Sequence, residues 1–405
     1  MIKNDLKKQI NKHIEKMSNP LSEMADKIFD YAEMGFQEYK SSALLCHWLE
    51  TRGFKVMRGI CGLDTAFRAT YEFGKDGPSI GLLCEYDALP IGHACGHHLQ
   101  GPVMLAVADA LKNIVFDTPF KLIVYGTPAE EGLQGKARML EKGCFKDMDV
   151  ALMVHAADYT TVDVKSLAGA RLDVKFKGVA AHQSLAPELS RDALDGLILA
   201  FQGIEFLRGH IKDDVRLFYG IKDCIGMPSN QDQTKAEGYV VFRTYHSGDV
   251  GELEKRIANI FKGAALMTGT EVEIVKSHEM VGKLPSHILN KLILDNAEAL
   301  SAPQILRPYR QKTGSTDFAF VSRQVPSAVC RVAFVPEGTP SHSKAFLEAG
   351  KSQRAHEAIL LGAKIIAAVV VDLIYNPETF QAVLQEHQRI KAEEQKLSSA
   401  SFQVS

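Results

Sequence analysis

Short apolar runs that alternate with amphipathic segments are the feature that most restricts how this chain can fold. Four runs have the length and composition of buried strands: 65–73, 79–86, 121–127 and 150–156. Segments with helical periodicity, 100–114 and 135–143, separate the second run from the third and the third from the fourth. Such alternation predicts an α/β fold, in which a mostly parallel sheet carries helices on both faces.

The pattern changes after about residue 165, which indicates a second domain. Strand-like runs now alternate with longer helical segments, in the order 170–178, 192–211, 237–246, 250–269 and 271–276. This order is typical of a small α+β unit with one covered face. Because α/β patterning resumes near residue 285, we predict one α/β domain of residues 1–166 and 284–405, interrupted by an inserted α+β domain of residues 167–283.

Composition restricts the partner and the compartment. The formal net charge of the 405 residues is −2, so neither nucleic acid nor a membrane surface is expected as the main partner, and a small molecule is. Seven scattered cysteines without a CxxC pair favour free thiols in a reducing compartment. The most apolar segment, 358–375, contains Lys364 and Asp372 and predicts a buried helix. No secretory signal is evident, and we expect a cytoplasmic protein.

Charged side chains cluster where three of the predicted strands end. Glu85 and Asp87 close one run, Glu130 and Glu131 follow the next, and His155 ends the third. Ligands of an open parallel sheet bind beyond the carboxyl ends of its strands. We therefore expect these carboxylates and this imidazole to meet at one edge of the sheet.

The adjacent pair Glu130 and Glu131 is informative in this position. Two neighbouring carboxylates repel each other unless a cation lies near. With a divalent metal ion, one carboxylate can ligate while the other takes a proton from metal-bound water. An isolated pair of this kind is more often a solvated surface feature, so the pair needs support from other residues.

That support comes from the stretch HACGHH, which contains His93, Cys95, His97 and His98 and leads into a predicted helix. Imidazole, thiolate and carboxylate together suit zinc, manganese, nickel or cobalt. The mixture with carboxylates favours an open catalytic site over a closed structural zinc site. His342, in a loop of small residues, also stands out, although a lone loop histidine is usually solvated.

The motifs in their order resemble the aminoacylase/carboxypeptidase family of dinuclear metallohydrolases (peptidase family M20). The resemblance is nearest to the amidohydrolase branch with plant auxin-conjugate hydrolases, p-aminobenzoyl-glutamate hydrolase and β-alanyl-lysine-type dipeptidases. The matching pieces are AEMGFQEYKSS (32–42), EYDALPIGHACGHHLQG (85–101), GTPAEEG (126–132), MVHA (153–156), KGVAAHQS with a later proline (177–187), DALDG (192–196), GSTDF (314–318) and SHSKAF (341–346).

The resemblance implies that residues 1–166 and 284–405 form a metal-binding catalytic domain, which holds two divalent metal ions (Zn, Mn, Ni or Co). It also implies that residues 167–283 form a lid domain through which a homodimer assembles. The metal ligands that it implies are Cys95, His97, Glu131, His155 and His342. Glu130 would be the general base and later the acid, and Asp87 would orient a ligand or the base. His182 would stabilise the oxyanion, often in the site of the partner subunit.

Substrate-binding residues follow less directly from the resemblance. The candidates are Asn230, Arg243, Gly314, Ser315 and Thr316, together with His182. Arg243 is as easily a surface arginine on a strand as a clamp for a carboxylate. His98 stands where the branch usually has Asp or Asn, and it is interpreted as an extra ligand, a partner of a ligand, or a substrate contact.

The function implied is the metal-dependent hydrolysis of an amide bond in a small N-acyl amino acid or dipeptide, as in an aminoacylase or dipeptidase, with metal-bound water activated by Glu130. One alternative is a cysteine hydrolase with Cys95 as nucleophile and His97 or His155 as base, which leaves the glutamate pair unexplained. A second alternative is a non-catalytic metal-bound binding protein of the same fold.

Overall fold

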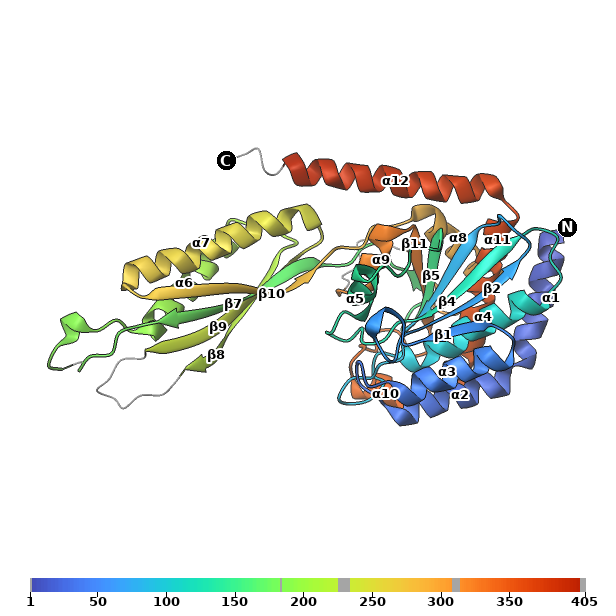
Figure 1. The fold of residues 1–405 in the computed structure, drawn as a ribbon, viewed down its shortest axis with the longest axis horizontal. Coiled ribbons are helices and arrows are strands. Elements are labelled where there is room, and N and C mark those ends of the chain that lie inside the picture. Colours follow the sequence, from blue (N-terminus) through green and yellow to red (C-terminus); the bar gives the residue numbers. More distant parts are fainter. Residues whose placement is uncertain (1, 183, 225–233, 308–313, 401–405) are drawn as a thin grey trace. The chain divides into compact units, whose positions relative to one another are not determined.

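The structure is a computed structural model that describes residues 2–182, 184–224, 234–307 and 314–400. Over the described residues the chain forms two compact units (Figure 1). Unit 1 comprises Met1–Lys165, Lys283–Lys312 and Thr316–Lys391, and unit 2 comprises Ser166–Gly282, Thr313–Ser315 and Ala392–Ser405.

Unit 1 contains a seven-stranded sheet in the order β1-β2-β4-β3-β5-β11-β6. The strands are β1 (Lys55–Arg58), β2 (Phe67–Phe73), β3 (Ser79–Cys84), β4 (Phe120–Gly126), β5 (Val150–Ala157), β6 (Thr161–Val162) and β11 (Ser327–Ala333). The four central strands β4, β3, β5 and β11 pair in parallel, whereas β1, β2 and β6 join antiparallel at the edges. The predicted mostly parallel sheet is therefore confirmed.

Helices cover both faces of this sheet because the central strands are apolar on both sides. On β5, Leu152 and Val154 belong to the larger core, and Ala151 and Met153 belong to the smaller one on the opposite face. The larger core is completed by α1 (Ile2–Lys16), α2 (Ser18–Tyr31), α3 (Tyr39–Thr51), α4 (Gln100–Asn113), α8 (His287–Ala299) and α11 (Gln353–Ile374). The smaller core is completed by α5 (Gly135–Glu141) and α9 (Phe318–Gln324). Two further helices, α10 (Lys344–Glu348) and α12 (Pro377–Ala400), contribute Phe346 and Val383 to the larger core.

Unit 2 is an antiparallel sheet in the order β10-β7-β9-β8, with a core that it shares with two helices. Its elements are β7 (Ala168–Lys177), α6 (Ala193–Arg208), β8 (Arg216–Cys224), β9 (Lys235–Thr244), α7 (Val250–Thr268) and β10 (Glu271–Met280). Strand β8 was not predicted. Leu217 is its only fully buried residue, so this edge strand lacks the apolar alternation that reveals β7 and β9.

The apolar segment near the C-terminus is a buried helix, as predicted. Val369, Val370 and Val371 of α11 are fully buried in the larger core. Among the described residues no single helix has both the length and the apolar composition to cross a bilayer, and α11 with α12 meets the criterion only as a pair bent by 99°.

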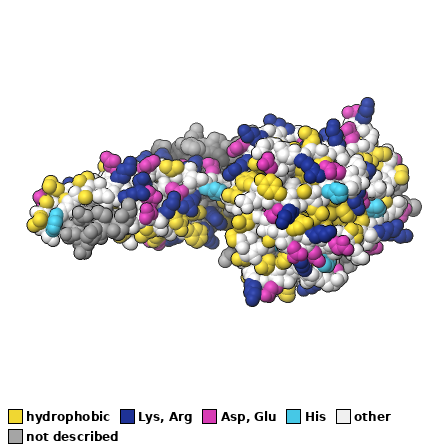
Figure 2. Space-filling model, turned by 60° about the horizontal axis from the view of Figure 1, so that its bottom comes forward, with side chains coloured by type: hydrophobic (Ala, Val, Ile, Leu, Met, Phe, Trp, Pro, Cys, Tyr) yellow, Lys and Arg dark blue, Asp and Glu magenta, His cyan; other side chains and the backbone are white. Residues whose placement is uncertain are grey.

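Basic and acidic side chains are mixed on the surface. On the face seen in Figure 2, Lys and Arg alternate with Asp and Glu over both units. This distribution matches the small net charge of the chain and fits a partner that is a small molecule.

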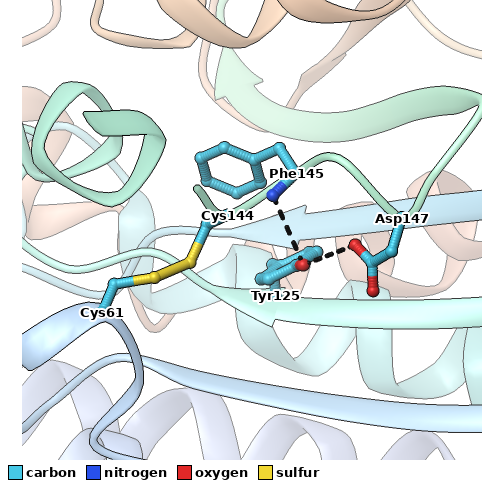
Figure 3. The surroundings of a disulfide bond; sticks show 5 residues. All are labelled: Cys61, Tyr125, Cys144, Phe145 and Asp147. Atoms are coloured by element: carbon cyan, nitrogen blue, oxygen red, sulfur yellow. Dashed lines mark hydrogen bonds between the residues drawn. A yellow bond between two sulfur atoms is a disulfide. The ribbon is translucent and has the colours of Figure 1, made fainter. Parts of the chain in front are cut away.

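The expectation of free thiols throughout is wrong for one pair of cysteines. Cys61 and Cys144, which are 83 residues apart in the sequence, form a disulfide bond (Figure 3). Near the disulfide, the Tyr125 hydroxyl donates a hydrogen bond to Asp147 Oδ1 at 2.7 Å. The pairing depends on contacts between the loop before β2 and the segment after α5, and sequence spacing cannot reveal such contacts. Cys46, Cys84, Cys95 and Cys330 are free.

We predict that breaking this disulfide lowers the free energy of unfolding by about 2–4 kcal/mol, because the bond restricts the unfolded chain over a long loop. The measurement is urea unfolding of the wild type with and without reductant. The variant Cys61→Ser/Cys144→Ser is the control, since reductant should leave its midpoint unchanged. Equal midpoints for the oxidised and reduced wild type would contradict the prediction.

Candidate metal centre

The strand order of unit 1 reverses at β3, and open α/β sheets form their ligand crevice at the carboxyl ends of the strands beside such a reversal. Strand β3 lies between β4 and β5, so the chain leaves β3 toward β4 and then crosses back to β5. The connecting helices α4 and α5 consequently pack on opposite faces of the sheet. At such a reversal the loops that follow neighbouring strands diverge and leave space for a ligand.

Residues that can ligate a metal ion converge at this crevice. Among the described residues, four groups have potential ligand atoms that all lie within 4.8 Å of one another, and three of them contain the residues expected from the sequence. These three are Cys95 with His97 and His155, Cys95 with Glu131 and His342, and His97 with Glu130 and Glu131. The structure thus brings together all five residues that the resemblance implies as ligands, and the implied base.

His97 is held by Asp87. Its Nδ1 lies 3.1 Å from Asp87 Oδ1, and the other carboxylate oxygen accepts from the Glu131 backbone N–H at 2.8 Å. One buried carboxylate therefore fixes an imidazole and the backbone of a neighbouring glutamate. A carboxylate behind the histidine is the usual arrangement that orients a metal-ligating imidazole.

Two of the converging atoms are buried and lack a hydrogen-bond partner among the described residues. They are His97 Nε2 and Glu131 Oε1. Glu85 Oε2 lies 3.3 Å from the first and His342 Nε2 lies 3.4 Å from the second, both without hydrogen-bond geometry. Since buried polar atoms are normally satisfied, these orphaned atoms fit a site that binds a cation.

Cys95 and His155 complete the arrangement. Cys95 Sγ lies 3.7 Å from His155 Nε2, and His155 Nδ1 lies 2.8 Å from the Ala156 carbonyl oxygen, to which its N–H donates. This hydrogen bond leaves Nε2 as the electron-pair donor. Burial and the nearby Arg331 lower the pKa of His155 to about 4, so the ring is neutral, as a metal ligand must be.

The turn that separates Cys95 from His97 requires glycine. Gly96 has φ of +82°, and a Cβ there would lie 2.6 Å from the Ala156 side chain. This close approach to the end of β5 brings the loop after β3 against His155. A larger residue at this position would push the thiol and the imidazole away from β5.

The loop that carries Glu130 is held in a strained conformation. Ala129 has φ of +60°, which is costly for a residue with a Cβ. Its N–H donates to Glu38 Oε1 at 2.8 Å, and its carbonyl oxygen accepts from the Gly135 N–H at 3.0 Å. Glu38 is fully buried and also accepts a hydrogen bond from Thr65 Oγ1. Since Glu38 directly precedes α3, the start of this helix fixes Ala129, the residue before Glu130.

Ionised groups at the crevice are unfavourable without a cation. Burial, with the nearby carboxylates of Glu85 and Asp317, raises the pKa of Glu130 to about 8. Burial also raises the pKa of the Cys95 thiol to about 12. A bound divalent ion would reverse both tendencies, because it stabilises carboxylate and thiolate directly. The donors present therefore fit a pair of metal ions.

A buried ion network lies next to Glu130. The Lys136 ammonium group contacts Glu85 Oε1 at 2.5 Å and Asp317 Oδ1 at 2.6 Å. Neither Lys136 nor Glu38 was assigned a role from the sequence. Both stand in segments that the motifs include or adjoin, but nothing local signals their burial.

The histidine-rich stretch contributes fewer ligands than its composition suggests. His93 Nε2 lies 3.0 Å from the Ile28 carbonyl oxygen, and His98 Nε2 lies 2.9 Å from the Gly350 carbonyl oxygen. The His98 ring also packs edge-on against Phe29. Neither imidazole belongs to a ligand group among the described residues, so His98 acts in packing and in tying the loop to the segment after α10.

The predicted substrate-binding residues are spread over both units. Thr316 lies in unit 1, where its Oγ1 accepts from the Phe318 N–H at the start of α9. Gly314 and Ser315 belong to unit 2 and bond with the backbone of Leu167. His182 and Arg243 also lie in unit 2, and Asn230 lies outside the described residues.

Comparisons with known proteins show which chains this one is similar to. The family described as Peptidase family M20/M25/M40 matches residues 85–371. The chain is 31% identical to one of the two subunits of the p-aminobenzoyl-glutamate hydrolase of Escherichia coli (strain K12), over 94% of each chain. It is 30% identical to the Xaa-Arg dipeptidase of Homo sapiens, over 96% of this chain and 93% of the human protein.

A solved structure shares the fold. The Bacillus subtilis YXEP protein, described as a dinuclear metal binding peptidase, superposes with a TM-score of 0.69 at 17% identity. The superposition covers 89% of this chain and 99% of that chain.

We predict a pH-dependent stabilising effect of Glu38→Gln. Burial raises the pKa of Glu38 from 4.5 to about 7, so the folded state favours the neutral carboxyl, and this contribution is lost as the pH rises from 4.5 to 7. Relative to Glu38→Gln, which cannot ionise, the wild type should lose about 3 kcal/mol over this interval. Urea unfolding at several pH values measures the difference, and a constant difference would contradict the prediction.

Proposed function

Because the chain belongs to peptidase family M20/M25/M40, we propose that it hydrolyses the amide bond of a small N-acyl amino acid or dipeptide with a pair of divalent metal ions. The chain is a metal-dependent amidohydrolase. The observation that carries the proposal is the convergence of a thiol, three imidazoles and two adjacent glutamates at the crevice of unit 1.

The proposed ligands fall into two overlapping sets. Cys95 belongs to both, with His97 and His155 in one and with Glu131 and His342 in the other. Cys95 would therefore help to hold either ion. Soft thiolate, imidazole and carboxylate donors together favour zinc, manganese, nickel or cobalt, and the screen below includes all four.

When bound, the metal ions would polarise the amide carbonyl and lower the pKa of a water molecule. Glu130 takes a proton from this water molecule while the water oxygen attacks the amide carbonyl carbon. Glu130 then gives the proton to the leaving amine. Asp87 keeps His97 and the Glu131 backbone in place throughout, through the two hydrogen bonds described above. The resemblance further assigns to His182 a hydrogen bond to the carbonyl oxygen as negative charge develops on it, often in the site of the partner subunit.

The proposed substrate carries a carboxylate. The names of the relatives point to an acyl-glutamate and to dipeptides ending in arginine. Within unit 2, Arg243 Nε is buried without a hydrogen-bond partner among the described residues. An unpaired guanidinium N–H is a good donor to a carboxylate, which supports Arg243 as the clamp, with Gly314, Ser315 and Thr316 as further contacts. Asn230 stays a candidate from the sequence alone.

We also propose a homodimer formed through unit 2. Its helix α6 and its edge strand β8 expose large apolar side chains: Ile198, Phe206, Phe218 and Ile221. An unpaired edge strand beside exposed apolar residues is a natural site for self-association.

The proposed location is the cytoplasm. The free cysteines Cys46, Cys84, Cys95 and Cys330 support it, whereas the Cys61–Cys144 disulfide is unusual for a reducing compartment.

The cysteine-hydrolase alternative is weaker on two grounds. Burial raises the pKa of the Cys95 thiol to about 12, so the thiolate needed for attack is scarce without a metal ion. This alternative also gives no role to Glu130 and Glu131. A non-catalytic binding protein would retain the ligands but would not need the base.

We predict that the purified chain, reconstituted with zinc, manganese, nickel or cobalt and then dialysed, retains two metal equivalents. It should cleave at least one member of a panel of N-acyl amino acids, p-aminobenzoyl-glutamate and dipeptides. Glu130→Gln should lower kcat by about 10²–10⁴-fold while it retains both metal equivalents, because Glu130 transfers protons and the two ligand sets are complete without it. Metal analysis and steady-state assays of the variant and the wild type measure this.

The control is His98→Asn, which changes a histidine of the same loop that lies outside the ligand groups and should retain both metal equivalents. An unchanged rate for Glu130→Gln would refute the mechanism. A chain that binds metal but cleaves nothing in the panel would favour the non-catalytic alternative.

A second prediction concerns the dimer. Phe206, which is 74% exposed on α6, should bury its ring in the interface, so that Phe206→Glu shifts the protein from dimer to monomer in light scattering after size exclusion. Val115→Glu is the matched control, since Val115 is 88% exposed in unit 1 and its change should leave the dimer intact. A Phe206→Glu protein that stays dimeric would place the interface elsewhere.

A further inference from the structure

Lys136 is a charged side chain with no access to solvent. It stands at the second position of α5, and its side chain is 0% exposed. Its ammonium group contacts Glu85 Oε1 at 2.5 Å and Asp317 Oδ1 at 2.6 Å. Its backbone N–H also donates to Asp317 Oδ2 at 2.9 Å. A lysine is rarely buried in this way unless it is paired.

The carboxylates around Lys136 include Glu130. Oxygen atoms of Glu85, Glu130 and Asp317 all lie within 4.8 Å of one another. Judged by its acidic residues alone, this group would suit a third metal ion. The ammonium group already bridges two of its three members, so the cation of this cluster is supplied by the chain itself.

The network also reaches the proposed metal ligands. The second oxygen of Glu85 accepts from Gln100 Nε2 at 2.7 Å and lies 3.3 Å from His97 Nε2. The Glu85 backbone N–H donates to Gln100 Oε1 at 3.0 Å. Glu85 is therefore fixed between the lysine and the start of α4, with little freedom to turn toward Glu130.

We propose that the Lys136 ammonium group is a fixed internal cation that positions the Glu130 carboxylate for proton transfer. It does so by holding Glu85 and Asp317 in place, so that neither carboxylate moves toward the metal centre or displaces Glu130. Lys136 is a positioning residue, since it acts through these two carboxylates. The inference rests on the function proposed above.

The positive charge of the Lys136 side chain is what the surrounding carboxylates require. With the ammonium group removed, Glu85 and Asp317 would be buried like charges beside a third carboxylate, and they would separate or take up protons. Either response moves the surroundings of Glu130. A shift of about 1 Å in a catalytic group can cost about 100-fold in rate.

The test is Lys136→Met, which keeps the length and the apolar contacts of the side chain and removes its charge. Steady-state kinetics of the metal-loaded protein use the member of the amide panel that the wild type cleaves fastest. We expect kcat to fall by at least about 100-fold, with KM changed by less than about threefold and both metal equivalents retained. Lys142→Met, an exposed lysine at the end of the same helix, should keep the wild-type kcat.

A second variant separates positioning from folding. Lys136→Met/Asp317→Asn removes one positive and one negative charge, so the buried charge is unchanged while the bridge is lost. This double variant should fold and bind metal even if Lys136→Met does not. Its kcat should stay at least about 30-fold below that of the wild type. A kcat within about threefold of the wild type in either folded variant would overturn the inference.

The background of Glu130→Gln distinguishes this inference from the proposed function. If Lys136 acts through Glu130, Lys136→Met should lower the residual rate of Glu130→Gln by less than about threefold. A further drop as large as that in the wild-type background would show a separate role and overturn the inference. A wild type that cleaves no amide, or an active Glu130→Gln, would instead refute the proposed function itself.

Discussion

Repulsion among carboxylates at the carboxyl ends of β3 and β4 is the constraint on which the rest of unit 1 depends. Glu130 lies within 4.8 Å of Glu85 and Asp317 in one group and of Glu131 in another, and burial makes the repulsion among these carboxylates costly. Two kinds of positive charge resolve it. The Lys136 ammonium group neutralises the buried side, and the orphaned atoms on the open side fit metal ions.

The sequence predicts the fold well where burial is regular. Strands β3, β4 and β5 are apolar on both faces, so their runs were continuous and their parallel pairing is confirmed. Strand β8 was missed because an edge strand with a single fully buried residue has no periodic pattern. The disulfide between Cys61 and Cys144 was missed for another reason. It joins loops that only the packed sheet brings together, and cysteine spacing carries no such information.

The sequence likewise predicts some residues of the candidate site and misses others. His97, Glu131 and their partners stand at strand ends or in a short dense motif, where local sequence indicates chemistry. The density of histidines in this motif was also misleading, because the His98 imidazole lies against the Gly350 carbonyl oxygen and not in the ligand groups. No local sequence pattern indicated that Lys136 is buried in the site. Its partner Asp317 is 181 residues away in the sequence, and an amphipathic helix start such as GKARM normally exposes its lysine. Pairings of this range depend on the tertiary fold and not on any local pattern.

Strained backbone at the crevice shows how the surrounding structure fixes reactive residues. Ala129, next to Glu130, and His342 both have positive φ, which costs about 1–3 kcal/mol for each. Both residues are held by hydrogen bonds from their backbone N–H groups, to Glu38 Oε1 and to the Ala94 carbonyl oxygen. Each acceptor lies in a segment far from the strained residue in sequence. The strain is therefore supported by long-range contacts, so the orientation of Glu130 depends on the packing of unit 1 as a whole and not on its own loop.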